Sequence, residues 1–277
     1  MVSELRPRGI GEILDSAVAL YRARFTRLVV VAAAVVVPVQ VLSAIVLLSA
    51  QPDHYSLSVT GAVTPQFDTS SFGVQLAAFV VVALVGVVSS ALVVATCTRI
   101  AADAYIGNVS GAPEAFRTVR PRVFAVVGIS LVVLVSEIAG LVLCFVGLLL
   151  PLIFFAVAVP VLILERVGVS GAIGRSVVLT KAHALHVLGV VLTAQLLSVV
   201  INGSLAEGIR LVFRSGGSTT AIVIGQSIAN TIAGVLTTPF IATAVVALYF
   251  DLRIRDEAYD IQLLMQRNDA RRAARAV

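Results

Sequence analysis

The sequence predicts an all-α, polytopic membrane helix bundle, in which six transmembrane helices form three hairpins and amphipathic helices lie on the cytoplasmic side. Three observations carry this prediction. Apolar residues make up 59% of the 277-residue chain and charged residues 13%, whereas soluble domains carry about 25% charge. The apolar residues lie in runs long enough to cross a bilayer. The basic residues gather between alternate runs, as they do in the loops on the cytoplasmic side of a membrane.

The first four spans come from three apolar runs. Crossing about 30 Å of hydrocarbon takes about 20 residues at about 1.5 Å each. The runs Leu28–Ala50 and Val74–Cys97 both meet that length. The run Val123–Leu164 is long enough for two spans and carries Gly147 and Pro151 near its middle. It therefore predicts a third and a fourth span joined by a tight turn.

The last two spans complete the predicted domain organisation. The fifth span is expected over Val187–Asn202, with an extension into the interfacial zone, and the sixth over Ala221–Phe250. The chain then divides into a cytoplasmic amphipathic N-terminal segment (1–27), a six-helix transmembrane domain (28–250) and a basic cytoplasmic tail (251–277).

The basic residues predict the orientation in the membrane. Eighteen of the twenty cations fall in the N-terminal segment, the tail and the two loops on the same side, whereas only Arg210 and Arg214 fall on the other side. Because cytoplasmic loops accumulate Lys and Arg, we expect both termini in the cytoplasm. Nineteen of the twenty cations are arginine, which hints at a GC-rich bacterial source, so the expected location is a bacterial plasma membrane.

The segment before the first span has helical spacing. One face would carry Ile10, Ile13, Leu14, Ala17, Tyr21 and Phe25. One interpretation is a helix along the inner leaflet, with Arg22, Arg24 and Arg27 in contact with anionic lipid head groups. The other is an elbow that packs under the bundle. A weaker segment of this kind, Ser170–Leu185, precedes the fifth span, and matches between the two at an offset of 160 residues leave an internal repeat open.

Glu137 is the one ionisable side chain that falls inside a predicted span. A charge at the centre of a membrane helix costs about 2.5 to 3.5 kcal/mol on insertion scales, so such an acid is neutral, has a partner or faces a wet cavity. This makes Glu137 a candidate functional residue. The alternative is a shift of the third span by one turn, which would bring Glu137 toward the outer interface.

The sixth span carries a stripe of small and polar residues at spacings of three and four. Its members are Gln226, Ser227, Asn230, Thr231, Gly234, Thr237, Thr238 and Pro239. Residues at these spacings share one helical face. That face either packs against another helix, with hydrogen bonds of about 0.6 kcal/mol each, or lines a substrate or ion path. The candidate intramembrane polar site is Glu137, Gln226, Asn230 and Gln195. Further polar residues inside spans are Gln40, Ser89 and Ser90.

Enzyme and metal signatures are absent from the sequence. The three histidines, His54, His183 and His186, form no metal-ligand spacing, and there is no Walker loop, nucleophile elbow or CxxC motif. The net charge of +5 is spread between apolar runs, which disfavours nucleic acid as a partner. We therefore expect no catalytic residue, metal or cofactor. The expected partners are the lipid bilayer and, as a candidate, another membrane or membrane-associated protein.

Two stretches at the predicted cytoplasmic borders carry a family resemblance. They are LRPRGIGEILDS, from Leu5 to Ser16, and LYFDLRIRDE, from Leu248 to Glu257. The chain resembles the membrane-domain family named for glycerophosphoryl diester phosphodiesterases, especially its stand-alone actinobacterial members. The resemblance implies a multi-helix bundle in the bacterial plasma membrane with an undefined biochemical role. The catalytic barrel of the phosphodiesterases has no room in this chain, so no catalytic residue is carried over. Asp251, Arg253 and Arg255 match the family pattern without an assigned role.

Two functions remain as expectations. The first is a non-catalytic accessory or scaffold module of the membrane, because enzyme motifs are absent and the cytoplasmic amphipathic segments are well marked. The second is a small-solute or lipid transporter that uses Glu137 and the polar face of the sixth span, since acids inside membranes often serve as coupling sites.

Overall fold

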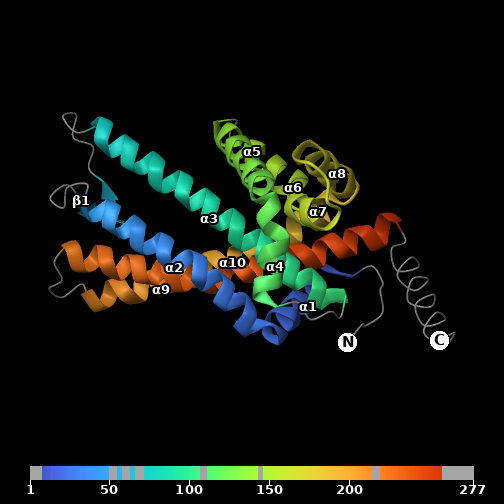
Figure 1. The fold of residues 1–277 in the computed structure, drawn as a ribbon, viewed down its shortest axis with the longest axis horizontal. Coiled ribbons are helices and arrows are strands. Elements are labelled where there is room, and N and C mark those ends of the chain that lie inside the picture. The colour runs from blue at the N-terminus through green and yellow to red at the C-terminus, as the bar shows by residue number, and fades with distance from the viewer. Residues whose placement is uncertain are drawn as a thin grey trace.

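The computed structural model describes residues 8–49, 55–57, 63–65, 72–106, 111–142, 146–213 and 219–257. Its helices are α1 (Ile10–Ala23), α2 (Phe25–Ser49), α3 (Phe72–Ile106), α4 (Ala112–Val119), α5 (Val123–Val142), α6 (Val146–Phe154), α7 (Ala158–Leu164), α8 (Val169–Lys181), α9 (Ala184–Phe213) and α10 (Thr219–Glu257) (Figure 1). A 3₁₀ turn, Arg120–Arg122, links α4 to α5. The short strands β1 (Tyr55–Leu57) and β2 (Val63–Pro65) pair antiparallel between α2 and α3. The all-α prediction is confirmed.

Six segments of the described chain are long and apolar enough to cross a membrane. They are Phe25–Val46, Val80–Ile106, Pro113–Gly140, Gly147–Leu164, Ala184–Ile209 and Ile224–Asp256. This confirms a multi-pass protein with six candidate spans. The predicted fifth span, Val187–Asn202, is the core of a longer helix, because α9 has 30 residues.

The last helix also continues beyond its predicted end. It runs to Glu257, so the segment predicted as a tail from residue 251 begins as helix. Asp251 and Leu252 are both buried there. With 39 residues at about 1.5 Å each, α10 is considerably longer than the about 30 Å of hydrocarbon. Other elements therefore pack around its C-terminal part.

Four long helices form one part of the molecule, and a shorter hairpin forms the other. Helices α2, α3, α9 and α10 pack along one another, while α5 and α6 pack chiefly on each other (Figure 1). The α5–α6 hairpin points away from the ends of α2, α9 and α10 that lie beside β1 (Figure 1). Helices α1, α4 and α8 lie toward the opposite end (Figure 1). We call this end the basic end.

The fourth span is interrupted at a position that the sequence did not predict. Helix α5 ends at Val142 and α6 begins at Val146, so Gly147 and Pro151 lie inside α6. A second break separates α6 from α7, where Ala158 N–H donates to Phe155 O at 3.1 Å in a tightened turn. Pro160 follows in the first turn of α7 and has no N–H to continue the helical ladder.

Helix α8 satisfies the carbonyl that this break exposes. Ser176 is fully buried, and its hydroxyl donates to Phe154 O at 2.7 Å. The other end of α7 is closed by Arg122, whose guanidinium donates to Leu162 O at 3.0 Å and to Arg166 O at 3.3 Å. Arg166 has a φ of 57°, the left-handed conformation in which helices commonly terminate. These contacts hold α7 and α8 against the start of α5.

Replacing Ser176 by alanine tests this role. Ser176→Ala removes the donor to the Phe154 carbonyl, and an unsatisfied buried polar group costs about 1 to 3 kcal/mol. The free energy of unfolding, measured by titration with dodecyl sulfate in mixed micelles, should fall by this amount. Ser170→Ala is the matched control because Ser170 lies exposed on the same helix. Equal stability of the two variants would show that Ser176 does not secure the break.

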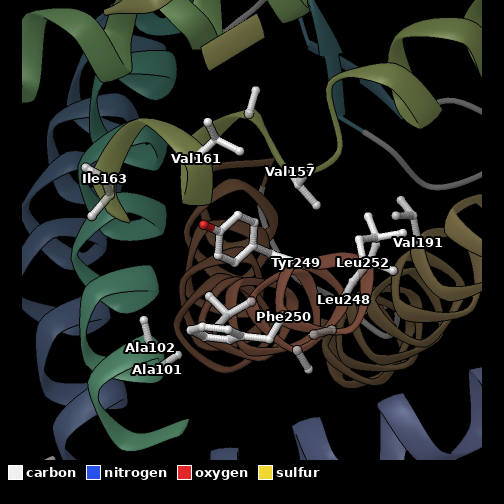
Figure 2. Packing of buried hydrophobic residues seen from close by; sticks show 14 of the residues in the cluster. Ala101, Ala102, Val157, Val161, Ile163, Val191, Leu248, Tyr249, Phe250 and Leu252 are labelled. Atoms are coloured by element: carbon white, nitrogen blue, oxygen red, sulfur yellow. The ribbon is translucent and has the colours of Figure 1, made fainter. Parts of the chain in front are cut away.

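The main hydrophobic core surrounds the C-terminal part of α10. Tyr249 and Leu248 are fully buried there. Figure 2 shows the Tyr249 ring on the side of Val157 and Val161, and Phe250 on the side of Ala101 and Ala102. The α6–α7 break and the end of α3 thus pack on the same stretch of α10.

The N-terminal helix packs against the helix bundle through one face. Ile13 and Ala17 are fully buried, whereas Ile10 and Phe25, expected on the same face, are exposed. Helix α1 runs along α10, and the hydroxyl of Tyr21 donates to Leu236 O at 3.0 Å. Partial burial raises the pKa of Tyr21, which keeps this donor protonated. The packing expected of the second interpretation is therefore present, and contact of α1 with the inner leaflet remains a prediction.

Candidate functional site

Glu137 lines a cavity between α3, α5 and the α6–α7 break. The cavity has a volume of about 300 Å³. Its described lining consists of Val87 and Ser90 of α3, five residues of α5, and Phe155 and Val159. None of the described lining residues belongs to α9 or α10. Ser130 and Glu137 are both on its α5 wall. They are two helical turns apart on one face. The cavity therefore extends along α5, with a hydroxyl toward one end and a carboxyl toward the other.

The carboxyl of Glu137 is half-buried and stands alone. It has no hydrogen-bond or ion-pair partner among the residues that the structure describes. Ser90, across the cavity on α3, is exposed, and its hydroxyl donates a hydrogen bond to Val87 O at 3.0 Å. The Ser90 oxygen is therefore left as an acceptor. The site combines one acid and two hydroxyls with otherwise apolar walls.

The polar stripe of α10 behaves differently along its length. Gln226 Nε2 donates to Asn230 Oδ1 at 3.3 Å, and Asn230 is exposed. Further along, Thr237 is buried and donates to Ala233 O at 2.8 Å. The structure thus brings Gln226 and Asn230 together.

The other two members of the predicted site lie elsewhere. Gln195 is exposed on α9, and none of Gln195, Gln226 and Asn230 is among the described residues that line the cavity beside Glu137. In this conformation the four candidates do not share one cavity. Close packing of the stripe is supported where Gly234 lies next to α2, since a Cβ there would be 3.7 Å from Val36.

The three arginines predicted to contact lipid head groups lie around the junction of α1 and α2. Arg22 is exposed, and Arg24 and Arg27 are partly exposed. Arg24 directly follows the last residue of α1, and its N–H donates to Leu20 O at 3.1 Å. Contact of these side chains with head groups remains a prediction.

The most densely bonded polar cluster lies at the basic end and was not predicted. Asp251 of α10 is 1% exposed. Its carboxylate accepts the Arg8 N–H and the Arg255 Nε–H, each at 2.7 Å. Arg255 also donates to Arg8 O. The side chains of α10 thereby bond both backbone groups of the residue that leads into α1, and hold the first and last described segments together. We call Asp251, Arg255 and Arg8 the terminal clamp.

A second cluster joins α10 to the α7–α8 region. The hydroxyl of Tyr249 donates to Glu165 Oε1 at 3.0 Å, and Arg175 Nε lies 3.3 Å from Glu165 Oε2. Arg253 donates to the Tyr249 hydroxyl at 3.3 Å and stands over its ring at 5.8 Å. Of the motif residues, Asp251 and Arg255 thus bind a distant part of the chain, and Arg253 binds Tyr249 of the same helix.

Two histidines link the start of α9 to the end of α10. His183 Nε2 lies 3.0 Å from Asp256 Oδ1. His186 Nε2 lies 3.3 Å from Asp251 Oδ2, but the contact does not have hydrogen-bond geometry. In the part of the chain with described coordinates, no group of three or more His, Cys, Asp and Glu side chains could hold a metal ion.

One signal in the sequence pointed toward these clusters. The stretch from Asp251 to Arg255 alternates charged and apolar residues at the end of a long apolar run. Read with helical spacing, it places Asp251 and Arg255 on one face. Their partner, Arg8, lies 243 positions before Asp251 and 247 before Arg255, so no local sequence pattern could identify it.

Comparison of the chain with models of known protein families, with curated proteins and with solved structures found no match. The family resemblance of the two border stretches therefore remains a prediction.

Proposed function

We propose that this chain is a non-catalytic membrane module that acts as an accessory or scaffold subunit, in a bacterial plasma membrane with both termini in the cytoplasm. The observation that carries the proposal is the terminal clamp. Its buried carboxylate and its guanidinium bind the Arg8 backbone. The charged motif of α10 is thus engaged in holding helices together, as expected of a framework that presents a fixed surface.

The distribution of charge supports the orientation in this proposal. Eighteen of the twenty cations belong to one side of the predicted topology, and such an excess marks the cytoplasmic side. The resemblance to a family of bacterial membrane domains points the same way. The proposed surface for partners is the basic end, which carries α1, α4 and α8.

Affinity purification of the full chain from its native membrane tests the accessory role. We expect a second protein to be recovered in constant stoichiometry, in mild detergent and after cross-linking alike. Asp256→Asn leaves the terminal clamp intact and should retain that partner, whereas Asp251→Asn should lose it. Consistent recovery of the chain alone would contradict the proposal.

A second candidate function is transport or handling of a lipid or small solute. The observation that favours it is the cavity of about 300 Å³ beside Glu137, which has no partner among the residues that the structure describes. A transporter needs this cavity to open to each side in turn. Reconstituted vesicles that show no Glu137-dependent flux of any tested solute or lipid would remove this candidate.

A further inference from the structure

We propose that the cavity beside Glu137 binds the ammonium group of a membrane amphiphile, a molecule with a hydrocarbon chain and one primary amine. The proposal does not depend on the accessory role, because the cavity can be occupied whether or not a partner protein binds the basic end.

The polar groups of the cavity select a hydrogen-bond donor. The ionised Glu137 carboxylate is acceptor-only, and the Ser90 O–H already donates its hydrogen bond to Val87 O. Ser130 lines the same cavity and can accept as well. An ammonium has three N–H donors and no acceptor. It therefore matches this set better than an alcohol, which has only one donor, or a phosphate, which has an excess of acceptors.

The charge of the site favours the same ligand. An unpaired carboxylate in a low-dielectric environment is unfavourable unless a cation lies close to it. The described chain supplies no cation to Glu137, since the residue has no ion-pair partner there. A cationic group that enters the cavity would complete the pair. An anionic head group would be repelled.

The surroundings of the cavity indicate that the ligand carries a hydrocarbon chain. Val88 and Val135, next to the lining residues on α3 and α5, are 39% and 62% exposed. Both belong to apolar candidate spans, so their exposed faces meet lipid. The volume of about 300 Å³ lies at the lower end of ligand pockets. It suits a head group with part of its chain, while the rest of the chain remains among the lipids.

Labelling with the apolar carboxyl reagent dicyclohexylcarbodiimide tests the proposal on the full chain in lipid nanodiscs. Mass spectrometry of the digested protein follows the adduct at Glu137, with Glu207 of α9 as the internal reference. We expect Glu137 to be modified, and the reaction to slow about tenfold when dodecylamine is added at about ten times its Kd. Modification at Glu207 should not change.

Two related compounds separate the sources of any protection. Dodecanol has the same chain without the cation, and methylammonium has the cation without the chain. Protection by dodecylamine alone supports the proposal. Equal protection by dodecanol would indicate an uncharged ligand or a general bilayer effect, and equal protection by methylammonium would indicate a site for soluble cations. Either result, or a Glu137 that dodecylamine does not protect, would overturn the proposal.

A substitution provides an independent readout. Dodecylamine should raise the thermal unfolding midpoint of the wild-type chain and of Glu207→Gln, because a ligand that binds only the folded state stabilises it. The same addition should leave Glu137→Gln unchanged. If Glu137→Gln does not fold, the labelling of the wild-type chain still decides. An equal rise in all three proteins would also contradict the proposal.

Discussion

Asp251→Asn should lower the free energy of unfolding by about 1.5 to 3 kcal/mol, the usual contribution of a hydrogen bond to a charged group. Asp251 is 1% exposed and accepts from the Arg8 N–H and from Arg255. The asparagine keeps the size of the side chain but leaves the Arg255 guanidinium without its counter-charge. The change is measured by dodecyl sulfate titration in mixed micelles.

Asp256→Asn is the matched control for this variant. It lies on the same helix, but its carboxylate is 28% exposed and pairs with a histidine. Exposed pairs contribute about 0 to 1 kcal/mol, so this variant should remain close to the wild type. Hydrogen exchange gives a second readout, because the Arg8 amide should lose protection only in Asp251→Asn. Similar stability of both variants, or unchanged exchange at Arg8, would show that the terminal clamp is not a stabilising feature.

Gly140→Ala should destabilise the α5–α6 hairpin by up to about 3 kcal/mol, the upper range for overpacking of a close contact. A Cβ at Gly140 would lie 2.5 Å from Gly147 O and 2.6 Å from Gly147 C. These are backbone atoms, which do not move aside as a side chain can. The two helices would have to separate at the end where the hairpin turns.

Two other glycines provide graded controls for this experiment. A Cβ at Gly86 meets nothing within 4 Å, so Gly86→Ala should stabilise α3 by up to about 1 kcal/mol through helix propensity. A Cβ at Gly189 would meet Ile10 Cδ1 at 2.5 Å, the free end of a side chain. Gly189→Ala should therefore fall between the two. If Gly140→Ala proves as stable as Gly86→Ala, the close approach of α5 and α6 is wrong.

Most of the fold could be predicted because its main signal is local. Run length alone placed the six spans, since about 20 apolar residues suffice to cross a bilayer. The same signal could not place the break at Phe155–Val157, because an apolar run looks the same whether or not its helix is interrupted. Gly147 and Pro151 were the more obvious breakers, yet both are accommodated inside α6, as membrane helices allow.

The candidate site was predicted only in part. Glu137 was identified because an acid is rare inside an apolar run, but its surroundings depend on how α5 packs on α3 and on the break before α7. Gln195 and Asn230 were grouped with it on polarity alone, and both are exposed on other helices. The terminal clamp was not predicted, since its energy comes from burial and from contacts between opposite ends of the chain. Contacts between residues so far apart in the chain leave no pattern in the spacing of residues along the sequence.

The topology in the membrane is the central claim, and cysteine accessibility tests it most directly. Single cysteines are introduced at Ser58 and Ser218, in the loops predicted to lie outside, and at Ser110 and Ser170, predicted to lie in the cytoplasm. The native Cys97 and Cys144 are replaced by alanine beforehand. A maleimide that does not cross the plasma membrane should label positions 58 and 218 in intact cells, and positions 110 and 170 only after permeabilisation. Labelling of position 110 or 170 in intact cells, or protection of 58 and 218, would contradict six spans with both termini in the cytoplasm.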